Sequence, residues 1–456
     1  MEYKNNILEL IGNTPLVKLN KITKGLKPQV FAKLESQNPG GSVKDRIGLQ
    51  MILDAENQGL LKPGGTVIEA TSGNTGIGIA LTAAYKGYRS VFVVTDKVSQ
   101  EKINYLRALG SEVIITSNAH DHDHPEYYVN IARRLNEEIP DSFFAYQYSN
   151  PSNPEAHYLT TGPELWEQTG GKITHFVSGI GTGGTISGTG KYLKEKNSDI
   201  KIIGADPYGS IYKPLKDRGE MIKGTPYLIE GVGQDCLPEN VDFDYIDEVI
   251  NVTDAESIAA AKNLTKYESI FSGGSTGTNL HVALKVAENL TENDVLVFIV
   301  CDIGERYLSK IYNHDWLVEH GFLSLETATL RDLVFQKKNS GDGNFISANP
   351  EMKVSEVIDI LHTHGLPQIP VLLEGRIFGC VKSTDLTHKI LENQALLDEP
   401  IRNVMEDCFP VLSMDTPLQE VKTKLKNSTA VLVEENRRIV DLISRYDLIE
   451  FMSENK

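Results

Sequence analysis

A lysine stands just after a Gly-rich turn, at the start of a predicted helix, within residues 38–46. Its Pro-Gly-Gly sequence forms the turn, Ser42 has the chemistry of a helix N-cap, and apolar residues at helical spacing over 47–55 predict a helix that runs to Gly59. Lys44 therefore lies near the second helical position. In a positive and partly dry pocket the pKa of its amine would fall, and the free amine could form a Schiff base. A solvated surface lysine is the alternative, and this stretch alone does not decide between them.

Three loops rich in glycine and hydroxyl side chains precede predicted helices. They are residues 71–76, 179–185 and 271–277. Hydroxyl groups and backbone N–H groups at a helix N-terminus are suited to hold an anion. The second loop contains a literal GxGxxG at Gly179, Gly181 and Gly184, with Asp206 further on at the end of a predicted strand. A dinucleotide site is therefore a rival to other phosphate ligands at this point.

Composition restricts the class of protein. The chain has 456 residues, of which 40% are hydrophobic and 23% charged, as in ordinary globular proteins. It has 45 basic and 62 acidic residues, a net charge of -17, which argues against nucleic acid as a partner. There is no signal-peptide core and no apolar run of membrane-spanning length, and the four cysteines lie far apart. We expect a reduced, cytoplasmic protein without membrane association. For the His-rich residues 120–124 we expect a solvated loop, and we predict no metal site.

Short β-branched runs alternate with helical patterns up to residue 301, which predicts an α/β fold with parallel strands covered by helices. The predicted strands are 30–34, 66–70, 90–95, 112–116, 175–178, 201–205 and 295–300, and the predicted helices after the first are 76–85, 99–109, 186–193 and one beginning near 277. Ligands in such folds lie at the carboxyl ends of the strands.

The last 130 or so residues contain a tandem repeat with a period of about 60 residues. Each repeat is predicted to contain a helix, a strand, a turn and a second strand, followed by an acidic residue at the start of another helix. The first unit comprises 354–362, 369–373, 377–382 and Asp385, and the second comprises 417–425, 430–433, 439–444 and Asp447. We predict a module separable from the part that carries the loops.

Five separated motifs occur together in one order: residues 11–15 (Ile-Gly-Asn-Thr-Pro), 38–46, 71–76, 181–185 and 273–275. In this combination residues 7–322 resemble the fold-type-II pyridoxal-phosphate enzymes of the cysteine synthase and cystathionine β-synthase family. The tail resembles a pair of CBS motifs. The resemblance implies two open twisted α/β subdomains in residues 1–322, followed by a smaller α+β regulatory domain in residues 323–456, with motifs at about 329–395 and 400–456. It favours the Schiff-base interpretation of Lys44 and a pyridoxal-phosphate site in place of a dinucleotide site.

Roles follow from the resemblance residue by residue. Lys44 matches the lysine that holds the cofactor and acts as the catalytic base. Asn74 matches the partner of the ring 3'-oxygen, and Ser275 that of the ring nitrogen. The phosphate cradle matches Gly181, Thr182, Gly183, Gly184 and Thr185, and the site for the substrate carboxylate matches Thr71, Ser72, Thr75, Gln147 and Tyr148.

The implied activity is a β-replacement, and three alternatives stay open. The tandem tail favours condensation of L-serine with L-homocysteine to L-cystathionine and water, with hydrogen sulfide release from cysteine as a side activity. A cysteine synthase that uses O-acetylserine and sulfide is the second reading, because residues 304–309 resemble those enzymes. A non-catalytic sensor of adenosyl ligands is the third. The family also implies a homodimer.

Two features concern regulation. Only ten residues precede Ile11, where animal members carry a haem-binding segment, so we expect no haem. In CBS motifs a Ser or Thr followed three residues later by Asp holds an adenosyl ribose. Ser444 and Asp447 match that pattern, whereas Lys382 replaces the hydroxyl before Asp385. S-adenosylmethionine or an adenine nucleotide at the second motif is the resulting hypothesis, against a tail that only packs or dimerises.

Overall fold

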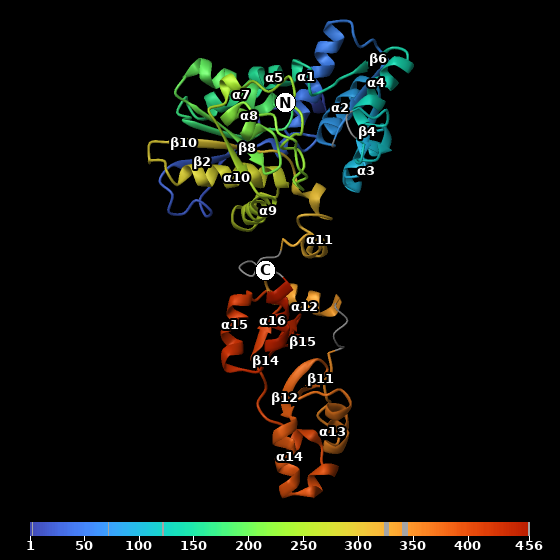
Figure 1. The fold of residues 1–456 in the computed structure, drawn as a ribbon, viewed down its shortest axis with the longest axis vertical. Coiled ribbons are helices and arrows are strands. Elements are labelled where there is room, and N and C mark those ends of the chain that lie inside the picture. The colour runs from blue at the N-terminus through green and yellow to red at the C-terminus, as the bar shows by residue number, and fades with distance from the viewer. Residues whose placement is uncertain (2, 72, 121–122, 323–327, 340–344, 455–456) are drawn as a thin grey trace. The chain divides into compact units, whose positions relative to one another are not determined.

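The computed structural model describes the chain except residues 2, 72, 121–122, 323–327, 340–344 and 455–456 (Figure 1). It divides into two compact units, Met1–Asn313 and His314–Lys456. The boundary expected after residue 322, and the limits expected for the two CBS motifs, remain predictions. Within the described residues, no helix has the length and apolarity needed to cross a membrane.

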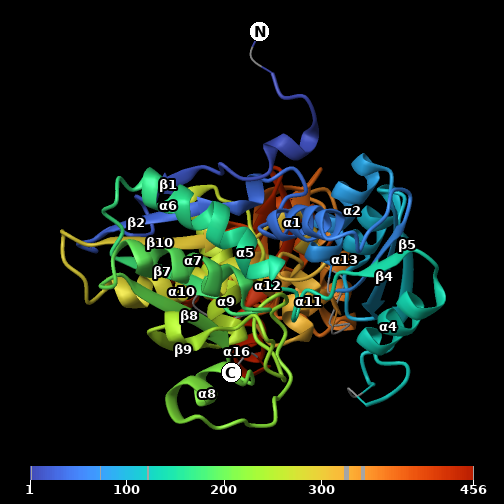
Figure 2. The ribbon, with the colours of Figure 1, turned by 90° about the horizontal axis from the view of Figure 1, so that it is seen from above.

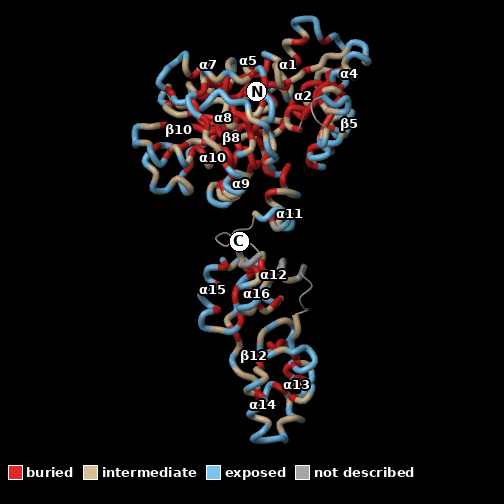
Figure 3. Tube along the Cα trace, viewed as in Figure 1, coloured by how far each residue is buried: buried red, intermediate tan, exposed pale blue. Residues whose placement is uncertain are grey.

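The larger sheet of the first unit has six strands in the order β1-β2-β10-β7-β8-β9. The strands are β1 (Leu16–Lys18), β2 (Gln29–Leu34), β7 (His175–Gly179), β8 (Lys201–Pro207), β9 (Glu248–Val252) and β10 (Val295–Val300). Every pairing is parallel except that of β1 with β2. All six residues of the central strand β10 are buried (Figure 3), as expected for a parallel strand covered on both faces.

A second sheet in the same unit has four parallel strands in the order β5-β4-β3-β6. They are β3 (Thr66–Ala70), β4 (Arg89–Thr95), β5 (Glu112–Thr116) and β6 (Ser142–Phe144). In Figure 2 the strands β4 and β5 lie on one side of helix α1, and β2, β7 and β10 lie on the other. The α/β prediction is confirmed, with two separate sheets.

Ten α-helices of the first unit cover these sheets within its described residues. They are α1 (Lys44–Asn57), α2 (Asn74–Lys86), α3 (Gln100–Ala108), α4 (Tyr128–Glu138), α5 (Ser152–Ala156), α6 (Gly162–Gln168), α7 (Gly184–Lys196), α8 (Tyr212–Arg218), α9 (Asp254–Asn263) and α10 (Gly274–Ala287). The backbones of α1 and α2 touch, because a Cβ on Gly78 would lie 2.6 Å from the Lys44 carbonyl oxygen, and one on Gly48 would overlap the Gly78 carbonyl. These glycines hold the start of α1 beside α2.

The start of α1 differs from the prediction. Lys44 is itself the first helical residue, and Val43 occupies the N-cap position without a side-chain cap. Ser42 is therefore not the N-cap. Its Oγ instead accepts a hydrogen bond from the Lys44 backbone N–H at 3.3 Å, within the turn that precedes the helix. The reason is that residues 41–43 are tied by backbone hydrogen bonds to residues 301–303, which keeps Ser42 extended as a bridge partner of Asp302.

The second unit has the predicted repeat. Its helices are α11 (His314–Glu319), α12 (Leu330–Asn339), α13 (Val354–Thr363), α14 (Ser383–Glu392), α15 (Leu418–Asn427) and α16 (Arg445–Glu454), and its strands are β11 (Gln368–Leu373), β12 (Arg376–Lys382), β13 (Val411–Ser413), β14 (Ala430–Glu435) and β15 (Arg438–Ser444). The hairpins β11–β12 and β14–β15 share one design, a two-residue turn with both residues at positive φ and a register shift near the turn. Such turns match the twist of antiparallel strands.

The core of the second repeat includes a helix that belongs to the first repeat in sequence. Helix α12 precedes the first hairpin in sequence, yet its Leu330 and Leu333 pack in one cluster with Val421, Val431 and Ile443 of the second motif. A separate cluster gathers Val354, Val357 and Ile369 of the first motif. The two motifs of the second unit therefore share a hydrophobic core and form one module rather than two independent domains.

Candidate active site

Lys44 lies at the junction of the two sheets. The Val43 N–H donates to the Cys301 carbonyl oxygen at 2.8 Å, which fixes the start of α1 at the carboxyl end of β10. Burial lowers the pKa of the Lys44 amine, and the negative charge of Asp302 acts in the opposite direction. A lysine with a lowered pKa has a larger fraction of the free amine, the form that acts as nucleophile and base.

The Gly-rich loop at residues 179–185 connects β7 to α7 and ends at the helix N-terminus. Gly183 has φ +89°, and a Cβ on Gly181 would lie 2.6 Å from the Gly231 carbonyl oxygen. A Cβ on Gly184 would overlap Asn153 Oδ1. Only glycine fits these positions, so backbone N–H groups remain accessible where the helix dipole favours an anion.

Two buried side chains that the sequence did not reveal support this loop. Asn153 Nδ2 donates to Thr182 Oγ1 at 2.9 Å and to the Gln147 carbonyl oxygen at 2.8 Å. His157 Nε2 lies 3.2 Å from Thr185 Oγ1. Burial holds the pKa of His157 well below its usual range, so its ring is neutral at physiological pH. The loop is held by neutral hydrogen bonds, and the charge it offers comes from the helix.

The residues predicted to bind the substrate carboxylate are partly brought together. Thr75 Oγ1 donates to Gln147 Oε1 at 2.6 Å, and Gln147 Nε2 donates to the Ala70 carbonyl oxygen at 3.4 Å. The hydrogen bonds of Asn153 connect this pair to the Gly-rich loop at residues 179–185. Thr71 Oγ1 accepts from the Gly73 N–H at 3.0 Å. Tyr148 is hydrogen-bonded elsewhere, because its hydroxyl lies 2.8 Å from that of Tyr128. Ser72 lies outside the described residues.

Asn74, the first residue of α2, is bound at both ends of its amide. Its Nδ2 donates to Asp302 Oδ2 at 2.7 Å, and its Oδ1 accepts from Arg306 Nη1 at 2.6 Å. Asp302 and Arg306 follow β10 of the other sheet, so this contact joins the two halves of the unit directly at the site.

Ser275 is the second residue of α10 and is buried. It shares a hydrogen bond with the Cys301 thiol, which also accepts from Asn279 Nδ2 at 3.3 Å. Burial and the charge of Asp302 raise the pKa of Cys301 to about 11, so this thiol is neutral. The surroundings of Ser275 are thus polar and uncharged on the side of Cys301.

These residues fit pyridoxal phosphate. The cofactor needs an anion cradle, a free amine, and partners for a ring nitrogen and a ring oxygen. The glycine cradle, Lys44, Ser275 and Asn74 have those chemical properties, and their elements meet at the carboxyl ends of parallel strands. Asp302 Oδ1 is buried and has no hydrogen-bond partner among the described residues, as expected beside a site built for another group.

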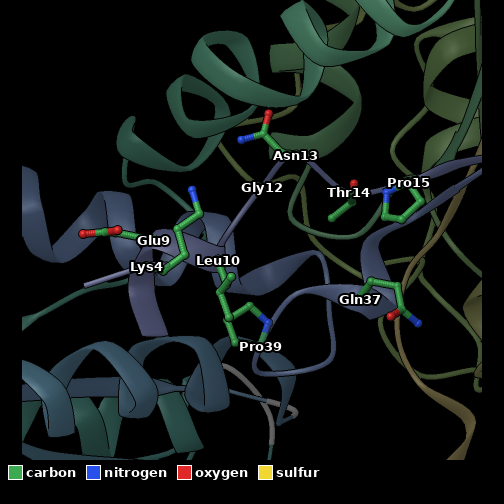
Figure 4. Close-up of a pocket in the computed structure, with 9 residues that line it drawn as sticks. All are labelled: Lys4, Glu9, Leu10, Gly12, Asn13, Thr14, Pro15, Gln37 and Pro39. Atoms are coloured by element: carbon green, nitrogen blue, oxygen red, sulfur yellow. The ribbon is translucent and has the colours of Figure 1, made fainter. Parts of the chain in front are cut away.

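Two other features are not part of this site. A hollow of about 260 Å³ in the N-terminal segment is lined by Lys4, Glu9, Leu10, Gly12, Asn13, Thr14, Pro15, Gln37 and Pro39 (Figure 4). It includes none of the residues predicted to bind cofactor or substrate. In the described part of the chain no cluster of His, Cys, Asp and Glu could hold a metal ion. The rings of His120 and His124 stack at 4.1 Å, and residues 121–122 between them are not described.

Ser444 and Asp447 form a local helix-capping arrangement. Asp447 Oδ2 accepts from the Ser444 N–H at 2.6 Å and from Ser444 Oγ at 2.7 Å, and the Asp447 N–H donates back to Ser444 Oγ. This reciprocal pattern begins α16, and Thr329 with Asp332 has a similar one at α12. Asp447 Oδ1 points elsewhere, 3.6 Å from Lys337 Nζ. The Ser-x-x-Asp pattern thus has a structural role here, whatever ligand the module binds.

Comparisons with known proteins agree with this geometry. Residues 7–302 match the family model described as "Pyridoxal-phosphate dependent enzyme", and residues 342–392 and 401–454 match the CBS domain. The chain therefore belongs to the pyridoxal-phosphate dependent enzymes and carries a tandem of CBS domains. The family resemblance inferred from the motifs is confirmed, and the dinucleotide alternative is wrong.

Similar proteins divide by how much of the chain they match. A cystathionine beta-synthase of Dictyostelium discoideum is 37% identical over 99% of this chain and 93% of its own length. A cysteine synthase of Staphylococcus aureus is 41% identical over 68% of this chain and 98% of its own length. Among solved structures, an O-acetylserine dependent cystathionine beta-synthase from Helicobacter pylori has 38% identity and a TM-score of 0.63, covering 69% of this chain and all of that one. Such enzymes act on small amino-acid substrates.

Proposed function

We propose that this chain condenses L-serine with L-homocysteine to give L-cystathionine and water. The observation that carries this proposal is the extent of the similarity. Cystathionine beta-synthase is similar over 99% of the chain, including the tandem module, whereas cysteine synthase is similar over 68%. Cysteine in place of serine would lose sulfide from the same β-position, so hydrogen sulfide release is the expected side activity.

Lys44 is the residue to which we assign covalent attachment of the cofactor and proton transfer at Cα. When bound, pyridoxal phosphate supplies an electron sink for negative charge at that carbon. The lowered pKa of Lys44 keeps part of its amine unprotonated, so that it can take the Cα proton and later return one. Its position at the start of α1, tied to β10, limits the distance over which the proton moves.

The remaining side chains hold and orient. We assign the phosphate to the loop of Gly181, Thr182, Gly183, Gly184 and Thr185, where the N-terminus of α7 favours an anion. Asn74 is assigned to the ring oxygen and Ser275 to the ring nitrogen. A neutral serine in that place leaves the ring unprotonated, which favours loss of a β-substituent over transamination. The substrate carboxylate is assigned to Thr71, Ser72, Thr75, Gln147 and Tyr148.

A steady-state assay of the purified holoenzyme tests the reaction. Serine and O-acetylserine are each supplied with homocysteine and with sulfide, and the four initial rates are compared. We expect serine with homocysteine to give the highest kcat/KM. Preference for O-acetylserine with sulfide would make the chain a cysteine synthase with an added module. No turnover with any pair would favour the non-catalytic sensor, which the retention of Lys44, Asn74 and Ser275 argues against.

In the tail we propose that the second motif binds an adenosyl ligand, S-adenosylmethionine or an adenine nucleotide, through Ser444 and Asp447. Asp447 Oδ1 is not used in the cap; it lies 3.6 Å from Lys337 Nζ and has a further lone pair to accept from a ribose hydroxyl. Calorimetry with each ligand tests this on wild type, Asp447→Asn and the control Asp385→Asn in the first motif. Heat lost only in Asp447→Asn supports the proposal, and an absence of heat in wild type removes it.

Assembly, compartment and haem content complete the proposal. We propose a homodimer, as the family resemblance implies, that is cytoplasmic and binds no haem. Sedimentation velocity of the holoenzyme checks the dimer, with a single species of about 101 kDa expected from twice 50.5 kDa. The visible spectrum of protein purified from cells supplied with haem precursors checks the haem, since a Soret band would contradict its absence.

A further inference from the structure

The carboxylate of Asp302 is the feature that the assigned roles leave unexplained. Asp302 is fully buried. Its Oδ2 accepts hydrogen bonds from Asn74 Nδ2 at 2.7 Å and Tyr307 OH at 2.5 Å, while its Oδ1 has no partner among the described residues. Removing a carboxylate from water is costly unless other groups compensate. A buried carboxylate with one open oxygen therefore indicates a group that meets positive charge in use.

Asn74 is held in one orientation by this carboxylate and by a cation. Arg306 Nη1 donates to Asn74 Oδ1 at 2.6 Å, and Asn74 Nδ2 donates to Asp302. An amide bound by an acceptor at its nitrogen and a donor at its oxygen cannot flip without losing both bonds. One hydrogen on Nδ2 remains to donate elsewhere. Arg306 itself is fixed by a hydrogen bond to the Gly40 carbonyl oxygen in the turn before Lys44.

Asp302 also adjoins the segment that carries Lys44. Ser42 and Asp302 are partners in an antiparallel bridge, and the Ile303 N–H donates to the Gly41 carbonyl oxygen at 3.1 Å. The negative charge of Asp302 favours the ammonium form of Lys44, against the effect of burial. The Asp302 carboxylate thus acts on two of the residues that we assign to the cofactor, Lys44 and Asn74.

We propose that Asp302 is a positioning residue for the cofactor: it fixes the Asn74 amide, together with Arg306, and supplies a buried negative charge beside the segment that carries Lys44. This inference rests on the proposed function for the roles of Lys44 and Asn74. Its effect on Lys44 is a property of the protein without cofactor, so it can be measured separately from turnover.

The first test measures the reactivity of Lys44 in protein stripped of cofactor. Acetic anhydride is applied in brief pulses between pH 6 and 10, and the acetylated fraction of the Lys44 peptide is measured by mass spectrometry. In Asp302→Asn the charge is lost with little change of shape, so the labelling profile should move to lower pH, with about tenfold faster labelling at a fixed pH for each unit of movement. Tyr307→Phe is the matched control, because it removes a hydrogen bond to the same oxygen but keeps the charge. Its profile should stay within about twofold of wild type.

The second test uses the visible band of the reconstituted holoenzyme, titrated with pH in the same variants. The midpoint should move in Asp302→Asn and stay near the wild-type value in Tyr307→Phe. Coincident profiles for Asp302→Asn and wild type in both tests would overturn the inference, as would equal movement in both variants, which would mark a purely structural role.

If Asp302→Asn does not fold, Arg306→Met tests the same charges with the opposite sign. It removes the cation on the other side of Asn74, so the Lys44 profile should move to higher pH, and an unchanged profile would again overturn the inference. If the cofactor proves to be bound by another lysine, the proposed function fails, yet the Lys44 profile still decides whether Asp302 acts on that amine.

Discussion

The strongest prediction on stability concerns a buried charge cluster beneath the start of α1. Arg46 binds Glu35 through two hydrogen bonds, Nε to Oε2 at 2.7 Å and Nη2 to Oε1 at 2.8 Å. Its Nη1 binds Glu164 at 2.6 Å, and Glu164 also pairs with Lys33 at 2.6 Å. The Arg46 and Glu35 side chains are at most 1% exposed. Arg46→Met would leave Glu35 buried without its bidentate partner, at a cost of about 3–5 kcal/mol of unfolding free energy.

The pH dependence supplies a second signature. Burial alone would raise the pKa of Glu35, but the charge and hydrogen bonds of Arg46 lower it from 4.5 to about 2. A lowered native pKa means that this stabilisation is complete above the unfolded value and is lost as the pH falls toward about 2; it amounts to about 3 kcal/mol. In Arg46→Met burial is no longer offset, so the Glu35 pKa should rise above 4.5. The pH dependence of the Glu35 contribution then reverses, and the free energy of unfolding falls as the pH rises.

Fluorescence can isolate the unit concerned. Trp166 lies on α6, the helix of Glu164, whereas Trp316 belongs to the second unit. In a Trp316→Phe background, denaturant unfolding followed through Trp166 gives the free energy for Arg46→Met at several pH values. The double variant Arg46→Met/Glu35→Gln should recover a large part of the loss, because a neutral amide needs no counter-charge. A loss below about 1 kcal/mol, or a double variant no better than the single one, would refute the reasoning.

Three further predictions test the cradle, a buried acid and the tail. Gly184→Ala should abolish retention of cofactor after dialysis, because its Cβ would overlap Asn153 Oδ1. The control Gly190→Ala lies on the same helix, and its Cβ would have its nearest contacts at 3.3 Å, so this variant should retain the cofactor. The visible absorbance of the dialysed protein measures both. Burial raises the pKa of Glu69 to about 8, above its usual 4.5, so the native state holds this carboxyl protonated. The free energy of unfolding therefore falls as the pH rises between those values. The Tm advantage of Glu69→Gln over wild type should grow from pH 5 to pH 9, and a constant difference would contradict this. Ser444→Ala removes the cap of α16 and should cost about 1 kcal/mol in the unit of Trp316, with unfolding followed through Trp166 unchanged.

The strands best predicted from the sequence are β3, β5 and β10, which residues 66–70, 112–116 and 295–300 match without an error at either end. β3 and β10 are fully buried, and continuous β-branched runs between polar loops are characteristic of such covered parallel strands. β5 lies at the edge of its sheet and has no fully buried residue. The three-residue strands β1 and β6 were missed, since so short a run carries no periodicity. The start of α1 was misassigned because backbone contacts with residues 301–303 override local capping chemistry.

The candidate site was predictable only where its residues lie in local motifs. Lys44, the Gly-rich loops and Ser275 stand in such motifs, but Asp302 contacts Asn74 across 228 positions of sequence. Asn153 and His157 support the cradle from α5 and the π-helical segment that follows it, with no motif of their own. The signal that could have found Asp302 is its place directly after a central parallel strand, where ligands of such folds lie.

The identity of the lysine that carries the cofactor can be determined directly in the holoenzyme. Borohydride added to the reconstituted holoenzyme makes the lysine–cofactor bond permanent, and proteolysis with mass spectrometry then locates the modified residue. We expect modification of Lys44 alone, with no labelled peptide and no turnover in Lys44→Ala. Modification of another lysine, or full turnover by Lys44→Ala, would contradict it.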